Sequence, residues 1–270
     1  MKKSHIFSLI LTLSCVLMLG GCGGAHPEIV PEQDDLPAIT VGCDDYTPFS
    51  YVDSNGELTG IDVELAEEAF GRLGYKPEFT IINWDEKKTL LENGDIDCVW
   101  SSFTMNDRED EYRWAGPYMY SAQVVAVNDD SDIYSLSDLE DRLIAVQSTT
   151  KPEDILRSRP DGVPSFHRII SVQKRDLIFT MLAKGYVDAA SAHVTAVEQF
   201  MKEFSVKFRI LDEPLQSVGL GAAFSIDDDR GIDVRLGEVM EEMRTDGTSA
   251  EIIGKYLSDP EKYLEAANGG

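Results

Sequence analysis

AITVGCDDYTPFSYVDSNGELTGIDVELAEEAFGRLGYKPEF, residues 38–79, is the stretch that decides the fold class. It begins with a short apolar strand, Ile39 to Cys43, and continues into an Asn-Gly pair, which is a strong hairpin-turn signal. A helix is predicted next, because apolar residues recur at the spacing of a buried stripe. Gly74 is expected to end this helix, since glycine adopts a left-handed C-terminal conformation at little cost. The apolar stripe consists of Leu65, Ala66, Ala69, Phe70 and Leu73.

The alternation of helices and strands continues beyond this stretch. A second helix is predicted from about Asp85 to Asn93, and the apolar strand IDCVW (96–100) follows it. Later, RLIAVQ (142–147) and VDAASA (187–192) are predicted strands with a helix between them. Such alternation indicates an α/β fold whose sheets are mostly parallel and flanked by helices. The apolar face of that later helix is predicted to comprise Leu177, Ile178, Met181 and Leu182.

Composition and charge exclude nucleic-acid binding as the function. The chain has 270 residues, an apolar fraction of 43% and a formal net charge of −25. The length and the apolar fraction are sufficient for one large or two ordinary folded domains. A charge of this sign repels nucleic acid and anionic lipid, and no basic run offsets it. An anionic ligand must therefore be captured by a few local cations and backbone N–H groups.

The N-terminal segment is predicted to lie outside the folded body. Residues 1–22 combine a lysine pair with an apolar stretch that is too short for a comfortable transmembrane helix, which is typical of a secretion signal. The signal ends in LGGC, which resembles the lipobox of bacterial lipoproteins and predicts lipidation at Cys22. An ordinary cleaved signal with an incidental cysteine is the alternative. Residues 23–37 hold three prolines and few apolar side chains, and are expected to be an extended linker.

Cysteines and histidines give no sign of a metal or cofactor site. Cys43 and Cys98 remain outside the signal, and the sequence leaves open whether they form a disulfide or two buried free thiols. The chain has no CxxC motif, and its four histidines are widely separated. We therefore expect neither a bound metal nor a cofactor.

Polar residues gather where the predicted strands end. In parallel α/β sheets the ligand crevice lies beyond the carboxyl ends of the strands. Hydroxyls, free amides and a guanidinium at such a place suit a carboxylate, because arginine presents a planar fork to its two oxygens. The candidate ligand-binding residues are Asp44, Asp45 and Tyr46 after the first strand, Ser101, Ser102, Thr104 and Arg108 after IDCVW, and Ser148, Thr149 and Thr150 after RLIAVQ.

Five motifs in order carry a resemblance to a known family. Together they resemble the substrate-binding lipoproteins of ABC importers in the polar-amino-acid-binding family, the bacterial extracellular solute-binding proteins, family 3. The resemblance covers about residues 38–258. The motifs are DDYTPFSYVDSNGELTGIDVELAEEAFGRLG (44–74), LLENGDIDCVWSSFTMNDRED (90–110), WAGPYMYSAQVVAV (114–127), DLEDRLIAVQSTT (138–150) and MLAKGYVDAASAH (181–193).

The resemblance implies a two-lobed fold of the periplasmic-binding-protein-like type II. Each lobe is then a mostly parallel sheet flanked by helices, and two crossover hinge strands join the lobes. Lobe 1 is expected to comprise residues 38–122 and 224–265, and lobe 2 residues 123–223. The crossings are expected near 121–127 and 220–225.

The resemblance also implies roles for individual residues. Arg108 matches the arginine that pairs with the ligand α-carboxylate, although the stretch between Thr104 and Arg108 is one residue shorter than in many relatives. Ser102 and Thr104 match strand-end groups that hold the amino and carboxyl groups. Thr149 and Thr150 match the residues of the second lobe that contact the ligand carboxylate. Tyr46 and Trp84 match the aromatic positions that sandwich the ligand side chain. Asp44 or Asp45 matches an acidic position that meets a polar ligand tail.

One position departs from the family pattern. Many relatives carry an aspartate, five residues after the aspartate of "DA", that pairs with the ligand α-amino group. The count from Asp188 reaches His193 instead. A neutral imidazole accepts one hydrogen bond but brings no negative charge. Either another acid replaces that aspartate, or the ligand is not an ordinary α-amino acid.

The resemblance implies a monomeric, non-enzymatic binder. It would capture an amino acid or a related small amine or carboxylate and deliver it to an ABC permease from the outer face of the cell membrane, where a lipid anchors it. Two alternatives remain. One is an enzyme on the same fold, such as a cyclohexadienyl or arogenate dehydratase, which would need an acid and a base placed against the substrate. The other is a ligand-sensing lipoprotein.

Overall fold

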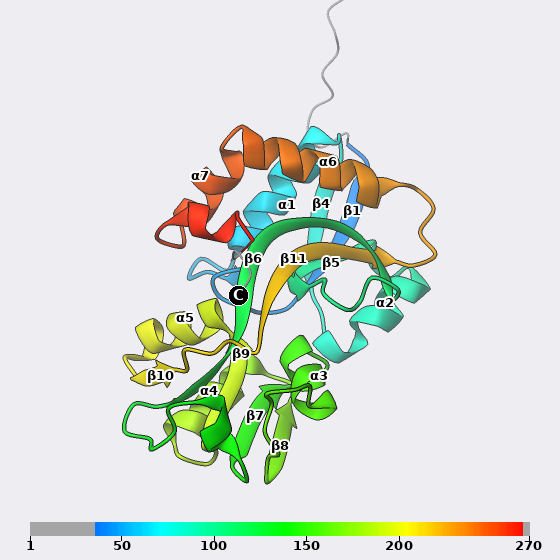
Figure 1. Cartoon of the computed structure of the whole chain (residues 1–270). Coiled ribbons are helices and arrows are strands. Elements are labelled where there is room, and N and C mark those ends of the chain that lie inside the picture. The colour runs from blue at the N-terminus through cyan, green and yellow to red at the C-terminus, as the bar shows by residue number, and fades with distance from the viewer. Residues whose placement is uncertain (1–35, 267–270) are drawn as a thin grey trace, which may run out of the picture.

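The computed structural model describes residues 36–266, which form two α/β lobes joined by two long strands (Figure 1). The predicted secretion signal, Cys22 and all but the last two residues of the predicted linker lie outside the described residues. Within the described range, no helix combines the length and the apolar character that a membrane crossing requires.

The first lobe contains the N-terminal elements together with the last two α-helices. Figure 1 shows α6 and α7 lying beside α1 in this lobe, although about 160 residues separate them in the chain. Its elements are β1 (Ala38–Cys43), β2 (Tyr51–Val52), β3 (Leu58–Thr59), α1 (Ile61–Arg72), β4 (Lys76–Ile81), the 3-10 helix η2 (Trp84–Glu86), α2 (Lys87–Asn93), β5 (Cys98–Thr104), α6 (Ile232–Thr245), α7 (Thr248–Gly254) and the 3-10 helix η4 (Pro260–Tyr263).

The second lobe is built from the middle of the chain. Two connecting strands, β6 (Tyr112–Asn128) and β11 (Gln216–Ser225), lead into it and out of it (Figure 1). Its elements are the 3-10 helix η3 (Leu136–Leu139), β7 (Leu143–Gln147), α3 (Lys151–Ser158), β8 (Arg168–Val172), α4 (Arg175–Ala183), β9 (Ala189–His193), α5 (Val194–Phe204) and β10 (Phe208–Ile210).

One sheet runs through both lobes in the order β4-β1-β5-β11-β6-β9-β7-β8, with β10 paired to β6. Pairing is parallel inside each lobe, where β1 joins β4 and β5, and β7 joins β8 and β9. The connecting strands pair antiparallel with each other and with their neighbours, and β6 passes from β11 to β9 at Gln123. The predicted two-lobed α/β fold with two crossover strands is therefore confirmed.

Helix α1 shows how the sequence pattern becomes packing. Four of the five predicted stripe residues, Leu65, Ala66, Ala69 and Phe70, are at most 1% exposed. Phe70 meets the ring of Trp100 in β5 edge-on, with 6.0 Å between ring centroids. Burial of one such side chain contributes about 2 kcal/mol, so this face fixes the helix on the sheet. Gly74 has a φ of 77°, the left-handed conformation predicted for it.

Two local expectations differ from the structure. β5 continues past Trp100 to Thr104, because β11 pairs with it at Phe103 and Thr104. In α4 the buried face includes Phe179, while Leu177 is 46% exposed. The ring of Phe179 packs on Phe200 of α5, with 5.0 Å between centroids. In both cases a partner distant in the chain, which no local pattern reveals, decides the outcome.

Candidate ligand-binding site

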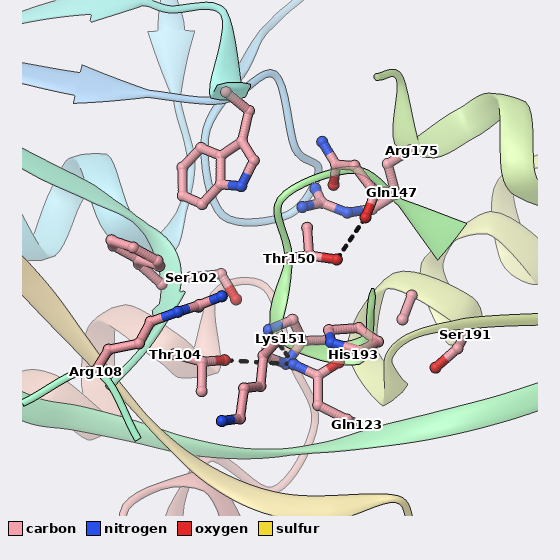
Figure 2. A pocket seen from close by; sticks show the side chains of 14 residues that line it. Ser102, Thr104, Arg108, Gln123, Gln147, Thr150, Lys151, Arg175, Ser191 and His193 are labelled. Atoms are coloured by element: carbon pink, nitrogen blue, oxygen red, sulfur yellow. Dashed lines mark hydrogen bonds between the residues drawn. The ribbon is translucent and has the colours of Figure 1, made fainter. Parts of the chain in front are cut away.

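A cavity lies between the two lobes, with about 370 Å³ of empty space when the part open to solvent is counted (Figure 2). Its first wall comprises Trp84, Ser102, Phe103, Thr104 and Arg108 from the first lobe and Gln123 from β6. Its second wall comprises Gln147, Thr150, Lys151, Pro152, Arg175, Ser191, Ala192 and His193 from the second lobe.

Ser102, at the end of β5, is held in an unusual backbone conformation. Its φ is 47°, in the left-handed region that disfavours side chains other than glycine and costs of order 1 kcal/mol. The amide of Ser102 donates a 2.6 Å hydrogen bond to Oδ2 of Asp62, and the hydroxyl of Tyr118 donates a 2.7 Å bond to Oδ1 of Asp62. Asp62 is 1% exposed and fixes this backbone at the cavity wall. The Oγ of Ser102 is buried there without a hydrogen-bond partner among the described residues.

Arg108 supplies a buried guanidinium to the first wall. The residue is 8% exposed, and its guanidinium carbon lies 5.3 Å from the ring centroid of Phe103. Its main-chain carbonyl accepts a 3.0 Å hydrogen bond from Nε1 of Trp114, which fixes the loop. Nη2 donates across the cavity to Oδ2 of Asp154 at 2.7 Å. The guanidinium thus already holds a carboxylate, from helix α3 of the other lobe.

His193 sits at the end of β9 and is 7% exposed. Nε2 of Gln123 lies 2.9 Å from its Nε2, and Oγ of Ser121 lies 3.2 Å from its Nδ1. Burial, and then the positive charge of Arg175, lower the pKa of His193 to about 3. The imidazole is therefore neutral at physiological pH, and brings no negative charge to the cavity.

Several hydrogen bonds cross the cleft and hold the lobes together. Asp85, in the first lobe, accepts from Oγ of Ser148 at 2.9 Å, from Oγ1 of Thr149 at 3.0 Å and from Nε2 of Gln173 at 3.1 Å. Burial opposes ionisation of Asp85, but these three hydrogen bonds outweigh it and lower its pKa. Lys151 of the second lobe reaches back to Asp107 of the first at 2.5 Å. The structure is consequently a closed form.

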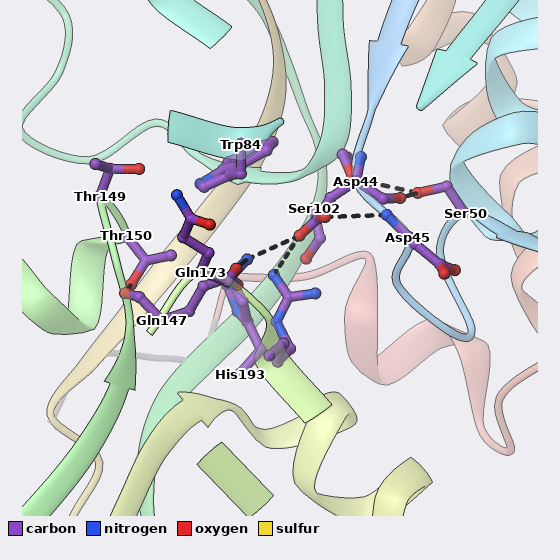
Figure 3. Close-up of polar contacts among 12 residues, drawn as sticks. Asp44, Asp45, Ser50, Trp84, Ser102, Gln147, Thr149, Thr150, Gln173 and His193 are labelled. Atoms are coloured by element: carbon purple, nitrogen blue, oxygen red, sulfur yellow. Dashed lines mark hydrogen bonds and ion pairs between the residues drawn. The ribbon is translucent and has the colours of Figure 1, made fainter. Parts of the chain in front are cut away.

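Asp44 belongs to the same set of cross-cleft contacts. Figure 3 shows its carboxylate near Gln147 of the second lobe, and Nε2 of Gln147 donates to its Oδ2 at 3.0 Å. The amide of Asp44 donates to Oγ of Ser101 at 3.0 Å, and Ser101 is 1% exposed. Ser101 therefore orders the end of β1 and does not line the cavity.

The structure brings together only part of the predicted ligand-binding set. Asp45 and Tyr46 line a neighbouring groove, and Tyr46 does not reach the cavity where Trp84 lies. Ser148 and Thr149 face Asp85 at the lobe junction. The predicted residues that line the cavity are Trp84, Ser102, Thr104, Arg108, Thr150 and His193.

Sequence reasoning missed several groups in or beside the cavity. Gln147 is the last residue of β7, and Arg175 follows β8 by three residues. Both could have been predicted, because ligand crevices lie beyond the carboxyl ends of parallel strands. Lys151 opens helix α3 directly after the predicted Thr150. Gln123 lies inside β6, at the residue where this strand stops pairing with β11 and starts pairing with β9. No sequence pattern indicates that position.

The described residues offer no cluster of His, Cys, Asp or Glu side chains able to hold a metal ion. Cys43 and Cys98 are both free and fully buried, which answers the question that the sequence left open. Burial, followed by the charge of Asp62, raises the pKa of Cys43 to about 12. Both thiols thus serve as core side chains.

Comparison with known proteins identifies the family. The model of the bacterial extracellular solute-binding proteins, family 3, matches residues 39–259. The chain belongs to this family. The histidine-binding periplasmic protein of Escherichia coli (strain K12) is 30% identical over 261 residues, which cover 92% of this chain and 96% of that protein.

Solved structures agree with this family 3 assignment. An ancestral arginine-binding protein bound to arginine has a TM-score of 0.74 at 26% identity, covering 82% of this chain and 98% of that one. An ancestral amino acid-binding protein described as a precursor of cyclohexadienyl dehydratase has a TM-score of 0.72 at 28% identity, covering 82% and 96%. Membership in this extracellular family implies an extracytoplasmic location.

Proposed function

We propose that this chain is the solute-binding component of an ABC importer, and that it captures an amino acid or a related small carboxylate between its lobes. The observation that carries the proposal is the buried guanidinium of Arg108 at a cavity with walls from both lobes. A buried cation with a planar fork of donors is well matched to a carboxylate. Relatives named as amino acid-binding proteins support the same ligand class.

The proposed mechanism is capture by lobe closure. Lobe 1 comprises residues 38–122 and 224–265 and offers Arg108, Ser102 and Thr104 to the incoming ligand. Lobe 2, residues 123–223, then closes through the contacts to Asp85. Closure is a population shift, driven by contacts that exist only in the closed form. The permease recognises the closed, loaded form.

Replacing Asp85 by alanine should open the cleft. The change removes three hydrogen bonds from the second lobe and leaves Arg108 in place. We expect a larger radius of gyration in small-angle X-ray scattering and roughly three- to tenfold weaker ligand binding, because part of the binding energy is then spent on closure. Asp132→Ala is the matched control, since Asp132 pairs with Arg142 inside the second lobe. An unchanged scattering profile for Asp85→Ala would contradict this mechanism.

We propose that the chain acts without catalysis. A dehydratase needs an acid and a base against the substrate. The one titratable group of the cavity wall with a strongly shifted pKa is His193, which stays neutral and touches Gln123 and Ser121. The relative described as a dehydratase precursor is itself named an amino acid-binding protein. Release of product from a cyclohexadienyl substrate by the purified protein would favour the enzyme instead.

We further propose that Cys22 is lipidated and that the mature, monomeric protein is tethered to the membrane by residues 23–37. The proline-rich composition of that segment supports an extended tether. Replacing Cys22 by serine should release the protein from the membrane fraction into the soluble fraction of cells. Retention of Cys22→Ser in the membrane fraction would contradict the anchor.

A thermal-shift screen tests the binding function. Purified protein is heated with amino acids, their derivatives and small carboxylates. A true ligand raises the unfolding midpoint in proportion to the logarithm of its concentration above Kd, because it binds only the native state. A screen in which no member of these classes shifts the midpoint would contradict the proposed function.

A further inference from the structure

The wall of the inter-lobe cavity carries three cationic side chains. Arg108, Lys151 and Arg175 line it, and its described lining residues include no aspartate or glutamate. The carboxylates that pair with two of these cations lie outside the wall and face water. The side chains of Asp154 and Asp107 are 55% and 71% exposed, whereas those of Arg108 and Lys151 are 9% and 8% exposed. Water and salt screen exposed charges far more than buried ones. The third cation, Arg175, lies 3.6 Å from Asp44, whose side chain is 17% exposed.

Arg175 carries a donor that has no partner. Its side chain is 11% exposed and lies on the ring of Tyr46, with 3.4 Å between the guanidinium carbon and the ring centroid. Nη2 is 3.6 Å from Oδ2 of Asp44. Nη1 is buried and has no hydrogen-bond partner among the described residues. A buried donor without an acceptor is costly, and an acidic group on a ligand would satisfy it.

A ligand ammonium group finds no comparable partner in the cavity. His193 is neutral, because burial and the charge of Arg175 lower its pKa. The unpaired acceptors on the wall are the hydroxyl oxygen of Ser102 and the amide oxygens of Gln123 and Gln147, all of them buried. These oxygens accept hydrogen bonds but carry no net charge. A ligand ammonium group would therefore gain no ion pair with a residue of the cavity wall.

We propose that the cavity selects a small dicarboxylate, with one acidic group on Arg108 and the second on Arg175. Figure 2 shows the two guanidinium groups reaching the cavity from different elements, the loop after β5 and the start of α4. This inference rests on the proposed function, because it names the ligand class of the same site. An acidic amino acid and its amine-free counterpart share the required chemistry.

Titration calorimetry on the full-length protein separates these classes. The probes are L-glutamate and L-aspartate, the amine-free glutarate and succinate, and the single-carboxylate ligands L-glutamine and L-arginine. At least one dicarboxylate should bind about a hundredfold more tightly than L-glutamine or L-arginine, since only it satisfies both guanidinium groups. If the two acidic amino acids bind more tightly than glutarate and succinate, the ligand is an amino acid. If glutarate or succinate binds more tightly, the ligand is an amine-free dicarboxylate.

Arg175→Gln tests the second contact. This variant should lose about a hundredfold in affinity for the best dicarboxylate and change little for L-glutamine, so that the preference nearly disappears. Arg175→Lys keeps the charge and should retain part of the preference. Arg168→Gln, at the exposed opposite end of β8, is the control and should behave as the unmodified protein. Thermal melting without ligand verifies that each variant is folded.

Two results would overturn the inference. The first is tighter binding of L-glutamine or L-arginine than of every dicarboxylate, which leaves the proposed binding function standing. The second is an unchanged dicarboxylate preference in a folded Arg175→Gln variant. Failure of all six probes to bind the unmodified protein would overturn this inference alone, because the proposed function covers further amino acids and is tested by the wider thermal-shift screen.

Discussion

Replacing Arg108 by glutamine should weaken ligand binding by about two hundredfold. The guanidinium is 8% exposed and lines the cavity, so a ligand carboxylate there is largely desolvated. Loss of one partner from such a buried, hydrogen-bonded charge pair costs about 3 kcal/mol, which corresponds to this factor. Titration calorimetry with the best ligand of the screen measures the change. The affinity of Arg108→Lys should lie between those of Arg108→Gln and the unmodified protein, because lysine keeps the charge but lacks the planar fork.

Asp154→Ala separates the ligand contact from the ion pair that Arg108 makes in the closed form. Asp154 occupies Nη2 of Arg108, and the alanine variant removes that carboxylate while the guanidinium stays. Binding should change by less than about threefold, because removal of a competing carboxylate favours the ligand while the loss of one cross-cleft contact disfavours closure. If Arg108→Gln and Asp154→Ala weaken binding equally, Arg108 acts through the ion pair and not through the ligand.

Replacing Asp62 by alanine should lower the free energy of unfolding by about 3 kcal/mol. The amide of Ser102 and the hydroxyl of Tyr118 then lose their acceptor in the core. Each buried donor without an acceptor costs about 1–3 kcal/mol. For a protein of this size the melting temperature should fall by roughly 6–12 °C. Ligand binding should weaken as well, because Ser102 is no longer held at the cavity wall.

The penalty of Asp62→Ala should depend on pH. Burial raises the pKa of Asp62 from its ordinary 3.8 to about 7, although hydrogen bonds from Tyr118 and Ser102 lower it in part. The folded state therefore holds this proton more tightly than the unfolded chain between these two values. The stability that Asp62 contributes is full below about pH 4 and is lost as the pH rises through 7. The difference in melting temperature between the two proteins should shrink from pH 5 to pH 8.

Glu67→Ala serves as the control on the same helix. Glu67 is exposed, and its removal should change the free energy of unfolding by less than about 0.5 kcal/mol. Equal melting temperatures for Asp62→Ala and the unmodified protein would contradict the assigned role of Asp62. So would a difference that grows from pH 5 to pH 8.

Local patterns were sufficient to predict an α/β fold with mostly parallel sheets, whereas the two lobes were implied by the family resemblance. The stripe of α1 is buried as predicted, and the end of α2 at Gly94, with a φ of 73°, follows from glycine chemistry alone. These features depend on residues within a few turns of each other. The resemblance of the ordered motifs supplied the crossover strands, which no periodicity indicates.

The site could be predicted only in part, because much of it depends on partners far away in the chain. Arg108 and Ser102 could be predicted because they come at or just after the carboxyl end of a predicted strand, and both line the cavity. Asp85 meets residues 63, 64 and 88 positions away, so its role in closure has no local signal. The stacking of Arg175 on Tyr46 likewise places Tyr46 beneath a cation and outside the cavity.

A crystal structure with the tightest-binding small carboxylate tests the central claim most directly. We predict one ligand carboxylate within about 3.2 Å of the Arg108 guanidinium, enclosed between the lobes and beside Ser102 and Thr104. A loaded crystal in which Arg108 keeps only Asp154 as its partner, while the ligand lies elsewhere on the protein, would contradict the account.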